Sequence, residues 1–321
     1  MSAVLAHDGI DHLFIGMVAA AAVGIYGAAW LAQPRPKAES RRLEVDGPVR
    51  HGGRSSAFAG RNVNVWRLLS WIAGVCCVLV ASLPWMEALA EESFTGHMVQ
   101  HLLVIIVGAP LLVLAQPVHT LGRAGWLPIG SRLGPTGRRW AAAWRRYAPV
   151  IGPMFFVAVL FVTHLTSIYD QALDNRLVHE LEHAAYLLGA TLTWSAVLGV
   201  GRGGAVARIG GVFGVAAGGA LLGMVLLSAP SPLIPTYEAQ LGTQEALNDQ
   251  RSASALMWVG GMLTTVPLLL LAVWRWAATE ERVVLRAEAL RDDDVRLAAL
   301  KRARMTATGA ARGNHHVGET E

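Results

Sequence analysis

Charged residues are scarce in this chain, and their scarcity excludes an ordinary soluble domain. Only 16% of the 321 residues are charged and 53% are hydrophobic, whereas soluble domains carry about 25% charged residues. Cysteine is scarcer still, because Cys76 and Cys77 are the only two. Since adjacent cysteines make poor disulfide partners, disulfide bonds do not hold this fold together.

The hydrophobic residues gather in seven blocks of about 17–25 residues, the length that crosses a hydrocarbon layer roughly 30 Å thick. A backbone in lipid must satisfy its own hydrogen bonds, so each block predicts a helix. The sequence therefore predicts an all-α fold, a polytopic membrane bundle of seven transmembrane helices. The blocks are Leu13–Ala32, Leu68–Met86, Phe94–Gln116, Pro149–Leu165, Val178–Leu198, Ile209–Ala229 and Ala253–Trp276.

The basic residues are distributed unevenly among the loops between these blocks. Of the 27 Lys and Arg residues, 25 fall in alternate loops and in the region from Arg275 onward, and only Arg176 and Arg251 fall elsewhere. The positive-inside rule then places the amino terminus outside and the carboxyl terminus in the cytoplasm. This clustering accounts for the net charge of +4 without nucleic acid as a partner. We expect a transmembrane domain over residues 1–276, with a flexible cytoplasmic loop at 33–65, and a charged cytoplasmic tail over 277–321.

Histidines occur inside the predicted spans. His97 and His101 are four residues apart, as are His179 and His183, and His164 closes the fourth block. Residues four apart lie on one face of a helix, and ionisable residues within a membrane are costly, so they mark functional sites. With the predicted topology, all five histidines lie near the outer ends of spans three, four and five.

Other polar residues reach the same level of the membrane. Asp249 and Gln250 lie at the mouth of the seventh span, so the sequence predicts a ring of nitrogen and oxygen donors at the outer face. Imidazole suits Cu, Zn, Fe and Ni, and Met98 and Met257 nearby favour Cu(I). Neighbouring residues of a helix are turned by about 100°. We therefore expect neither Glu180 nor Glu182 to share the histidines' face.

A zinc protease is the main alternative. Residues 179–183 match the H-E-x-x-H signature, in which Glu180 would be the general base, and equally the reversed H-x-x-E-H form. Such an intramembrane metalloprotease, with zinc as its metal, does not need the second histidine pair. A bis-histidine haem protein needs axial ligands on opposite sides of the macrocycle, which four-residue spacing on one helix does not provide.

Beyond these patterns, the sequence resembles the CtaG family of cytochrome c oxidase assembly factors. The resemblance runs in order from about residue 66 to 276. The segments that carry it are residues 96–103 and 108–112, Thr163-His164, Tyr169-Asp170, Ala172-Leu173, His179-x-x-Glu182-His183, Asp249-Gln250 and Met257-Trp258.

The resemblance implies a multi-pass protein of the bacterial plasma membrane that helps to deliver copper to the oxidase and is not itself an enzyme. Its partners would be oxidase subunits and a copper donor protein. The family's histidines correspond to the five histidines above, and its acidic-amide pair to Asp249 and Gln250. Glu182 is the glutamate expected in the family, and it would orient the imidazoles without binding the metal itself. Glu180, and with it the protease signature, would then be incidental. Direct copper transfer and chaperoning of the apo-subunit both remain open.

The basic asymmetry makes a topological prediction. Reporters fused after Leu165 or Ala229 should lie outside, and those fused after Gln116 or Trp276 should lie in the cytoplasm. Paired phosphatase and fluorescent-protein fusions measure this directly. A cytoplasmic reading after Leu165 would place the histidines on two faces of the membrane and contradict a single site.

Overall fold

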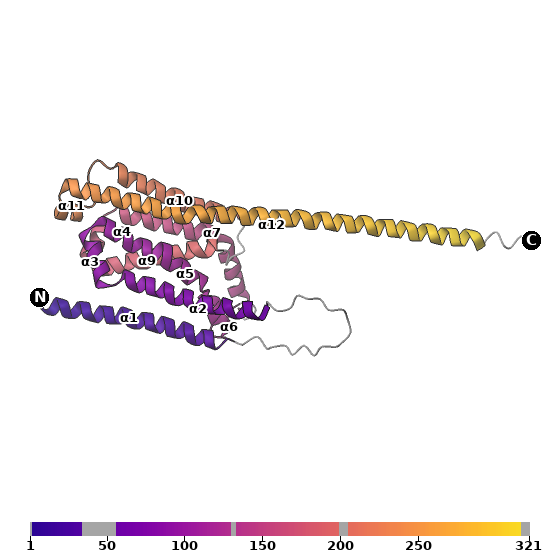
Figure 1. The fold of residues 1–321 in the computed structure, drawn as a ribbon, viewed down its shortest axis with the longest axis horizontal. Helices are drawn as coiled ribbons and strands as arrows, with labels where there is room; N and C mark the ends of the chain where they lie inside the picture. Colours follow the sequence, from indigo (N-terminus) through magenta and orange to yellow (C-terminus); the bar gives the residue numbers. More distant parts are fainter. Residues whose placement is uncertain (1, 34–55, 130–132, 199–204, 316–321) are drawn as a thin grey trace, which may run out of the picture. The chain divides into compact units, whose positions relative to one another are not determined.

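The chain folds into helices throughout the residues that a computed structural model describes, which are 2–33, 56–129, 133–198 and 205–315 (Figure 1). In chain order the elements are α1 (Ser2–Leu31), α2 (Ser56–Ala81), α3 (Pro84–Glu92), α4 (Phe94–Leu102), the π-helix η1 (Leu103–Gly108), α5 (Ala109–Leu114), α6 (Pro117–Arg123), α7 (Pro135–His164), α8 (Ile168–Asp174), α9 (Arg176–Val197), α10 (Ala205–Ser228), α11 (Pro235–Leu241) and α12 (Thr243–His315). The all-α prediction is confirmed.

Each of the seven predicted apolar blocks lies in these helices, but fewer of them qualify as spans by length and composition. Four do so within the described residues, and a fifth is added if α2 and α3, bent by 52°, form one broken span. The apolar part of α1 is short, and α9 is not among the candidates. Seven spans and their orientation stay predictions. The four are Phe94–Arg123, Arg146–His164, Val206–Ser228 and Thr243–Leu270.

The chain divides into two compact units, Met1–Leu269 and Leu270–Glu321. The first contains α1 to α11 and the apolar beginning of α12, and the second continues α12 as a helix with many charged residues. Most of the predicted loop 33–65 lies outside the described residues, but from Ser56 onward it belongs to α2 instead. Ala57 and Ala59 are strong helix formers there.

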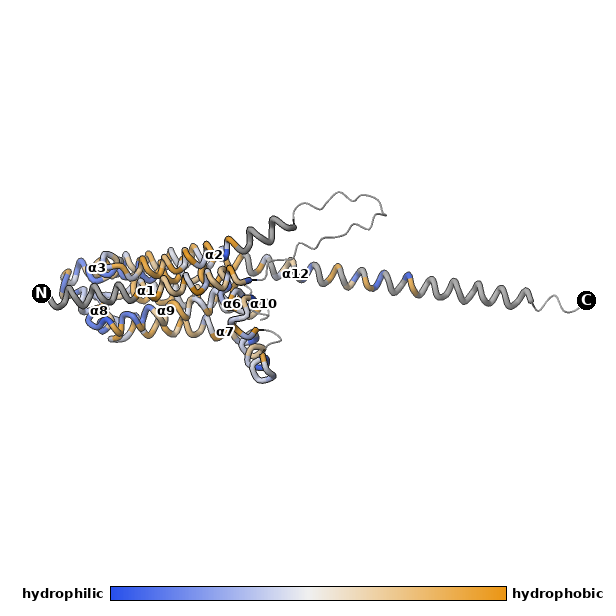
Figure 2. Tube along the Cα trace, turned by 90° about the horizontal axis from the view of Figure 1, so that it is seen from below, coloured by the Kyte–Doolittle hydropathy of each residue, from blue (hydrophilic) through white to orange (hydrophobic). Residues whose placement is uncertain are grey.

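Helix α9 is central to the first unit, where it contacts α5, α7, α8, α10 and η1. Small residues allow the closest approach, to α7. A Cβ atom added to Gly152 of α7 would lie 2.9 Å from the backbone carbon of Leu192, and one added to Gly189 of α9 would lie 3.2 Å from the Cα of Phe156. Close backbone packing of this kind is typical of membrane helices. Figure 2 shows that the end with α3 and α8 is the more hydrophilic end of the bundle.

The amino terminus of α4 is capped by residues from two parts of the chain. The Ser93 side chain accepts a hydrogen bond from the Gly96 amide at 3.0 Å. Asp249 of α12 accepts from the amides of Phe94 at 2.6 Å and Thr95 at 3.2 Å, and from the Thr95 hydroxyl at 2.5 Å. These bonds satisfy amides that a helix start leaves without intrahelical partners. They fix the first turn of α4, which carries His97.

The π-helix η1 follows α4 directly and ends two residues before Pro110. Proline lacks an amide hydrogen and its ring clashes with the carbonyl four residues earlier, so the backbone widens before it. The Trp194 indole of α9 donates a hydrogen bond to the Ile105 carbonyl at 2.9 Å. This bond joins the widened turn to the central helix, and π-helices of this kind are frequent at functional sites.

The packing of α3 on α4 makes one stability prediction. A Cβ atom at Gly96 would overlap the backbone carbonyl of Leu89, so Gly96→Ala should destabilise the fold by about 1–3 kcal/mol through overpacking. Gly214→Ala in α10 is the matched control, because nothing lies within 4 Å of its added Cβ. Thermal unfolding in detergent compares the two. An unchanged Gly96→Ala protein would contradict the packing described here.

The cap on α4 gives a second stability prediction. Asp249→Ala should lose about 0.5–2 kcal/mol, the usual cost of removing a helix cap, whereas Asp249→Asn keeps one acceptor oxygen and should lose less. Asp174→Ala, at an exposed position, serves as the control for removal of a carboxylate. Chemical unfolding of the purified protein measures the three differences, and equal stability of the two Asp249 variants would argue against capping.

Candidate metal centre

Four of the predicted histidines meet between α4 and α9. On α4 the ring centroids of His97 and His101 are 4.3 Å apart, and on α9 those of His179 and His183 are also 4.3 Å apart. Across the two helices, His97 lies 5.6 Å from His179 and His101 lies 5.0 Å from His183. We call these four residues the histidine cluster. The four-residue spacing on both helices produces it, since each pair occupies one helix face.

A carboxylate lies within this cluster. The Glu182 oxygens are 3.8 Å from Nε2 of His97 and 3.7 Å from Nε2 of His101. One donor atom from each of these three buried residues lies within 4.8 Å of the others. Our expectation that neither glutamate shares the histidines' face is therefore wrong for Glu182. Residues three and four apart share a face, so Glu182 lies with His179 on the side of α9 that meets α4. Glu180 is half-buried and is not a member of that three-residue group.

Eight side-chain nitrogen and oxygen atoms of the centre are buried without hydrogen-bond partners among the described residues. Buried polar groups are nearly always paired, and an exception calls for an explanation such as an absent ion. A buried carboxylate is especially costly without a compensating charge. The donor set therefore fits a metal cation. The atoms are Nδ1 and Nε2 of His97 and His101, Nε2 of His164 and His183, and both oxygens of Glu182.

The fifth histidine, His164, lies beside the cluster at the end of α7 and is 4% exposed. Its Nδ1 is 2.9 Å from the Leu160 carbonyl, and 3.1 Å from each of the hydroxyls of Thr163 and Tyr186. Because a carbonyl can only accept, the bond to Leu160 requires a proton on Nδ1. The lone pair of the neutral ring is then on Nε2, which is free to bind a ligand.

Two buried tyrosines border the histidines. The Tyr169 ring centroid is 4.8 Å from that of His97, and the Tyr186 centroid is 4.6 Å from that of His101. Burial raises the pKa of the Tyr169 phenol well above its usual range, so the phenol is neutral at physiological pH. Tyr186 was not among the predicted site residues. The signal was available, since Tyr186 lies three residues after His183 on the same helix face.

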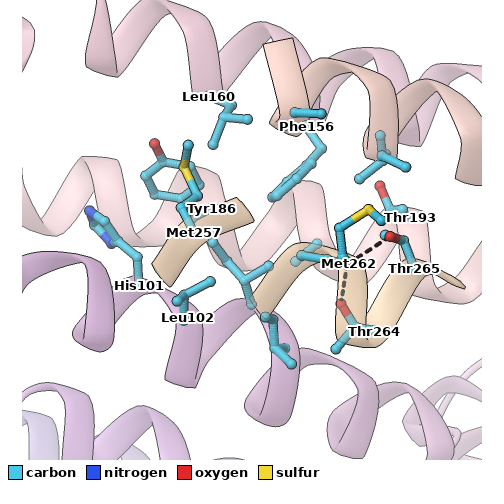
Figure 3. A pocket seen from close by; sticks show the side chains of 18 of the residues that line it. His101, Leu102, Phe156, Leu160, Tyr186, Thr193, Met257, Met262, Thr264 and Thr265 are labelled. Atoms are coloured by element: carbon cyan, nitrogen blue, oxygen red, sulfur yellow. Dashed lines mark hydrogen bonds between the residues drawn. The ribbon is translucent and has the colours of Figure 1, made fainter. Parts of the chain in front are cut away.

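The remaining predicted residues have other contacts. The Asp249 carboxylate caps α4, and the Gln250 amide donates to the Leu226 carbonyl and accepts from the Leu233 amide, both at 2.8 Å. Their roles around a metal stay predictions. Met98 and Met257 are buried and line one cavity of about 110 Å³ together with His101 and His164. Figure 3 shows Met257 and His101 in this cavity.

Known proteins support a family assignment. A sequence model of the family described as cytochrome c oxidase caa3 assembly factor (CtaG) matches residues 49–279. The chain is also 24% identical over 262 residues to uncharacterized proteins of Mycobacterium bovis and Mycobacterium tuberculosis, covering 75% of this chain and 39% of each relative. A Mycobacterium leprae protein is 24% identical over 245 residues, covering 72% and 37%.

The chain thus spans about two-fifths of the length of these curated relatives. No solved structure matches it. The family match covers well over half of the sequence and includes all the histidines of the centre. The chain therefore belongs to the CtaG family of cytochrome c oxidase caa3 assembly factors.

Proposed function

We propose that this assembly factor binds copper in the histidine cluster and assists metallation of a terminal cytochrome c oxidase at the outer face of the bacterial plasma membrane. Copper is then cargo that the protein holds and passes on. The observation that carries the proposal is the cluster of four imidazoles with one buried carboxylate beside His97 and His101. Both nitrogens of these two histidines and both oxygens of Glu182 have no hydrogen-bond partners among the described residues.

The chemistry of the donors favours copper or zinc. Imidazole binds both ions, and nitrogen with oxygen donors in a tetragonal arrangement is typical of Cu(II). Family membership favours copper over zinc, because cytochrome c oxidases contain copper. Glu182 would contribute negative charge directly beside the ion, which lowers the cost of a cation in this buried place.

Burial would also govern exchange of the ion. His97 is fully buried and His101 is 2% exposed, whereas His179 and His183 are half-buried. The α9 pair would therefore be the point of entry and release, and the α4 pair the inner side of the site. A partner that supplies or accepts copper would approach α9, and an oxidase subunit and a copper donor protein are the partners that we propose.

The zinc-protease alternative requires a different position for the glutamate that acts as general base. In the H-E-x-x-H arrangement Glu180 must face the metal-bound water, whereas the carboxylate beside the histidines is that of Glu182. The reversed signature would use Glu182 as the base. A catalytic site also keeps a position open for water and substrate, and the burial of His97 and Glu182 argues against ready access to a peptide.

Substitutions in the cluster test the proposal. His101→Ala and His183→Ala should each lower copper affinity and cytochrome c oxidase activity in cells, because each removes a ligand. Glu182→Gln should lower copper affinity by about 10–100-fold, the usual effect of losing a supporting group around a metal. Competition with a chromophoric chelator measures affinity in the purified protein, and metal analysis measures copper content.

Glu180→Gln is the matched control, because it removes a carboxylate one helix turn from His183 without touching the three-residue group. We expect its copper affinity and the oxidase activity to match those of the unaltered protein. A Glu180→Gln protein that retains its metal but is inactive would favour the protease and contradict the copper assignment.

A further inference from the structure

The cavity beside the histidine cluster is lined by side chains of types that can bind a soft metal ion. It lies within the first unit of the chain, between α4, η1, α7, α9, α10 and the beginning of α12. Figure 3 shows His101 and Met257 on one side of it and Met262, Thr264 and Thr265 on the other. Met98 and His164 also line it. Two thioethers and one imidazole, from α4, α12 and α7, thus line the same cavity.

The hydrogen bonding of His164 leaves one ring nitrogen available for a ligand. Its Nδ1 bonds to the Leu160 carbonyl at 2.9 Å, and its buried Nε2 has no hydrogen-bond partner among the described residues. Metal-bound histidines commonly donate their second ring N–H to a carbonyl in this way, which fixes the tautomer and the ring orientation. The free nitrogen therefore needs a partner that the described residues do not supply.

The two methionines are equally inaccessible to water. Met98 is 2% exposed and Met257 is 8% exposed. A thioether is a soft, uncharged donor that selects Cu(I) over harder divalent ions. The Met257 methyl group lies close to Gly223 of α10, where an added Cβ would be 3.7 Å away. Met257 also lines the cavity and is buried, so its side chain lies inside the bundle.

Charge separates this set from the histidine cluster. The cluster includes the Glu182 carboxylate, which offsets part of the charge of a divalent ion. Met98, Met257 and His164 are neutral donors in a mostly apolar cavity. The cost of burying an ion rises with the square of its charge, so this neutral set discriminates strongly against Cu(II) and Zn(II).

We propose that Met98, Met257 and His164 form a second copper station that is selective for Cu(I). His101 lines the cavity and also contacts Glu182, so it lies between the two stations and can belong to either. This inference rests on the proposed copper function. It adds that the protein holds two ions, one in a nitrogen–oxygen site and one in a sulfur–nitrogen site.

Titration of the full-length protein in detergent tests the station. Under anaerobic conditions with Cu(I) and a chromophoric competitor, the unaltered protein should bind two ions, and with Zn(II) it should bind one. The double variant Met98→Leu, Met257→Leu should bind one Cu(I) and still one Zn(II). Leucine conserves the volume of methionine and is well tolerated in cores, so the comparison isolates the loss of sulfur.

Two further variants keep the result interpretable. Met86→Leu changes a methionine that is buried in α3 and outside the cavity, and should still bind two Cu(I). His164→Gln should lose one Cu(I) and keep Zn(II). X-ray absorption of the copper-loaded protein should show sulfur neighbours in the unaltered and Met86→Leu proteins, but not in the double variant.

The outcomes separate this inference from the function on which it rests. Two Cu(I) ions retained by the double variant, or copper without sulfur neighbours in the unaltered protein, would overturn the second station and leave the histidine cluster in place. His97→Ala should abolish Zn(II) binding. If the His97→Ala protein binds Zn(II) and Cu(I) as the unaltered protein does, the proposed function itself is contradicted.

Discussion

The main energetic constraint on this structure is the burial of the Glu182 carboxylate among imidazoles. Glu182 is 4% exposed and lies within 4 Å of two histidines of another helix. Without a cation such an arrangement is unfavourable, so the surrounding structure must hold α4 and α9 together firmly. Trp194 of α9 contributes to this by donating a hydrogen bond to the Ile105 carbonyl of η1 at 2.9 Å, and Asp249 of α12 fixes the first amides of α4.

Much of the site could be predicted from the sequence because its signals are local. The four-residue spacing on α4 and α9 predicts two imidazole pairs, and the alternation of basic loops brings the pairs to one level. Glu182 could have been assigned correctly by the same reasoning, since it lies three residues after His179. The contact of Asp249 with Phe94 could not, because no local pattern joins residues 155 positions apart.

The central helix also shows why hydropathy finds some membrane helices more readily than others. Helix α9 is long enough to span, yet it is not a candidate by composition. The face of α9 that packs on other helices need not be apolar, and it carries Glu182 beside the histidines. The exposed face carries apolar residues, among them Leu177, Leu181 and Leu188. The buried polar residues of α9 thus lower its hydropathy, which is why composition does not identify it as a candidate span.

The π-helix after His101 has a consequence for how this site can change. A π-turn contains one residue more than an α-turn, and one residue of an α-helix corresponds to a rotation of about 100°. The direction in which His97 and His101 point, relative to the rest of their span, is therefore set by a single residue within Leu103–Gly108. Loss of that residue would turn both imidazoles away from α9 while every histidine stayed in the sequence. A gap of one residue at this place in a related chain would thus disrupt the cluster although all four histidines were present.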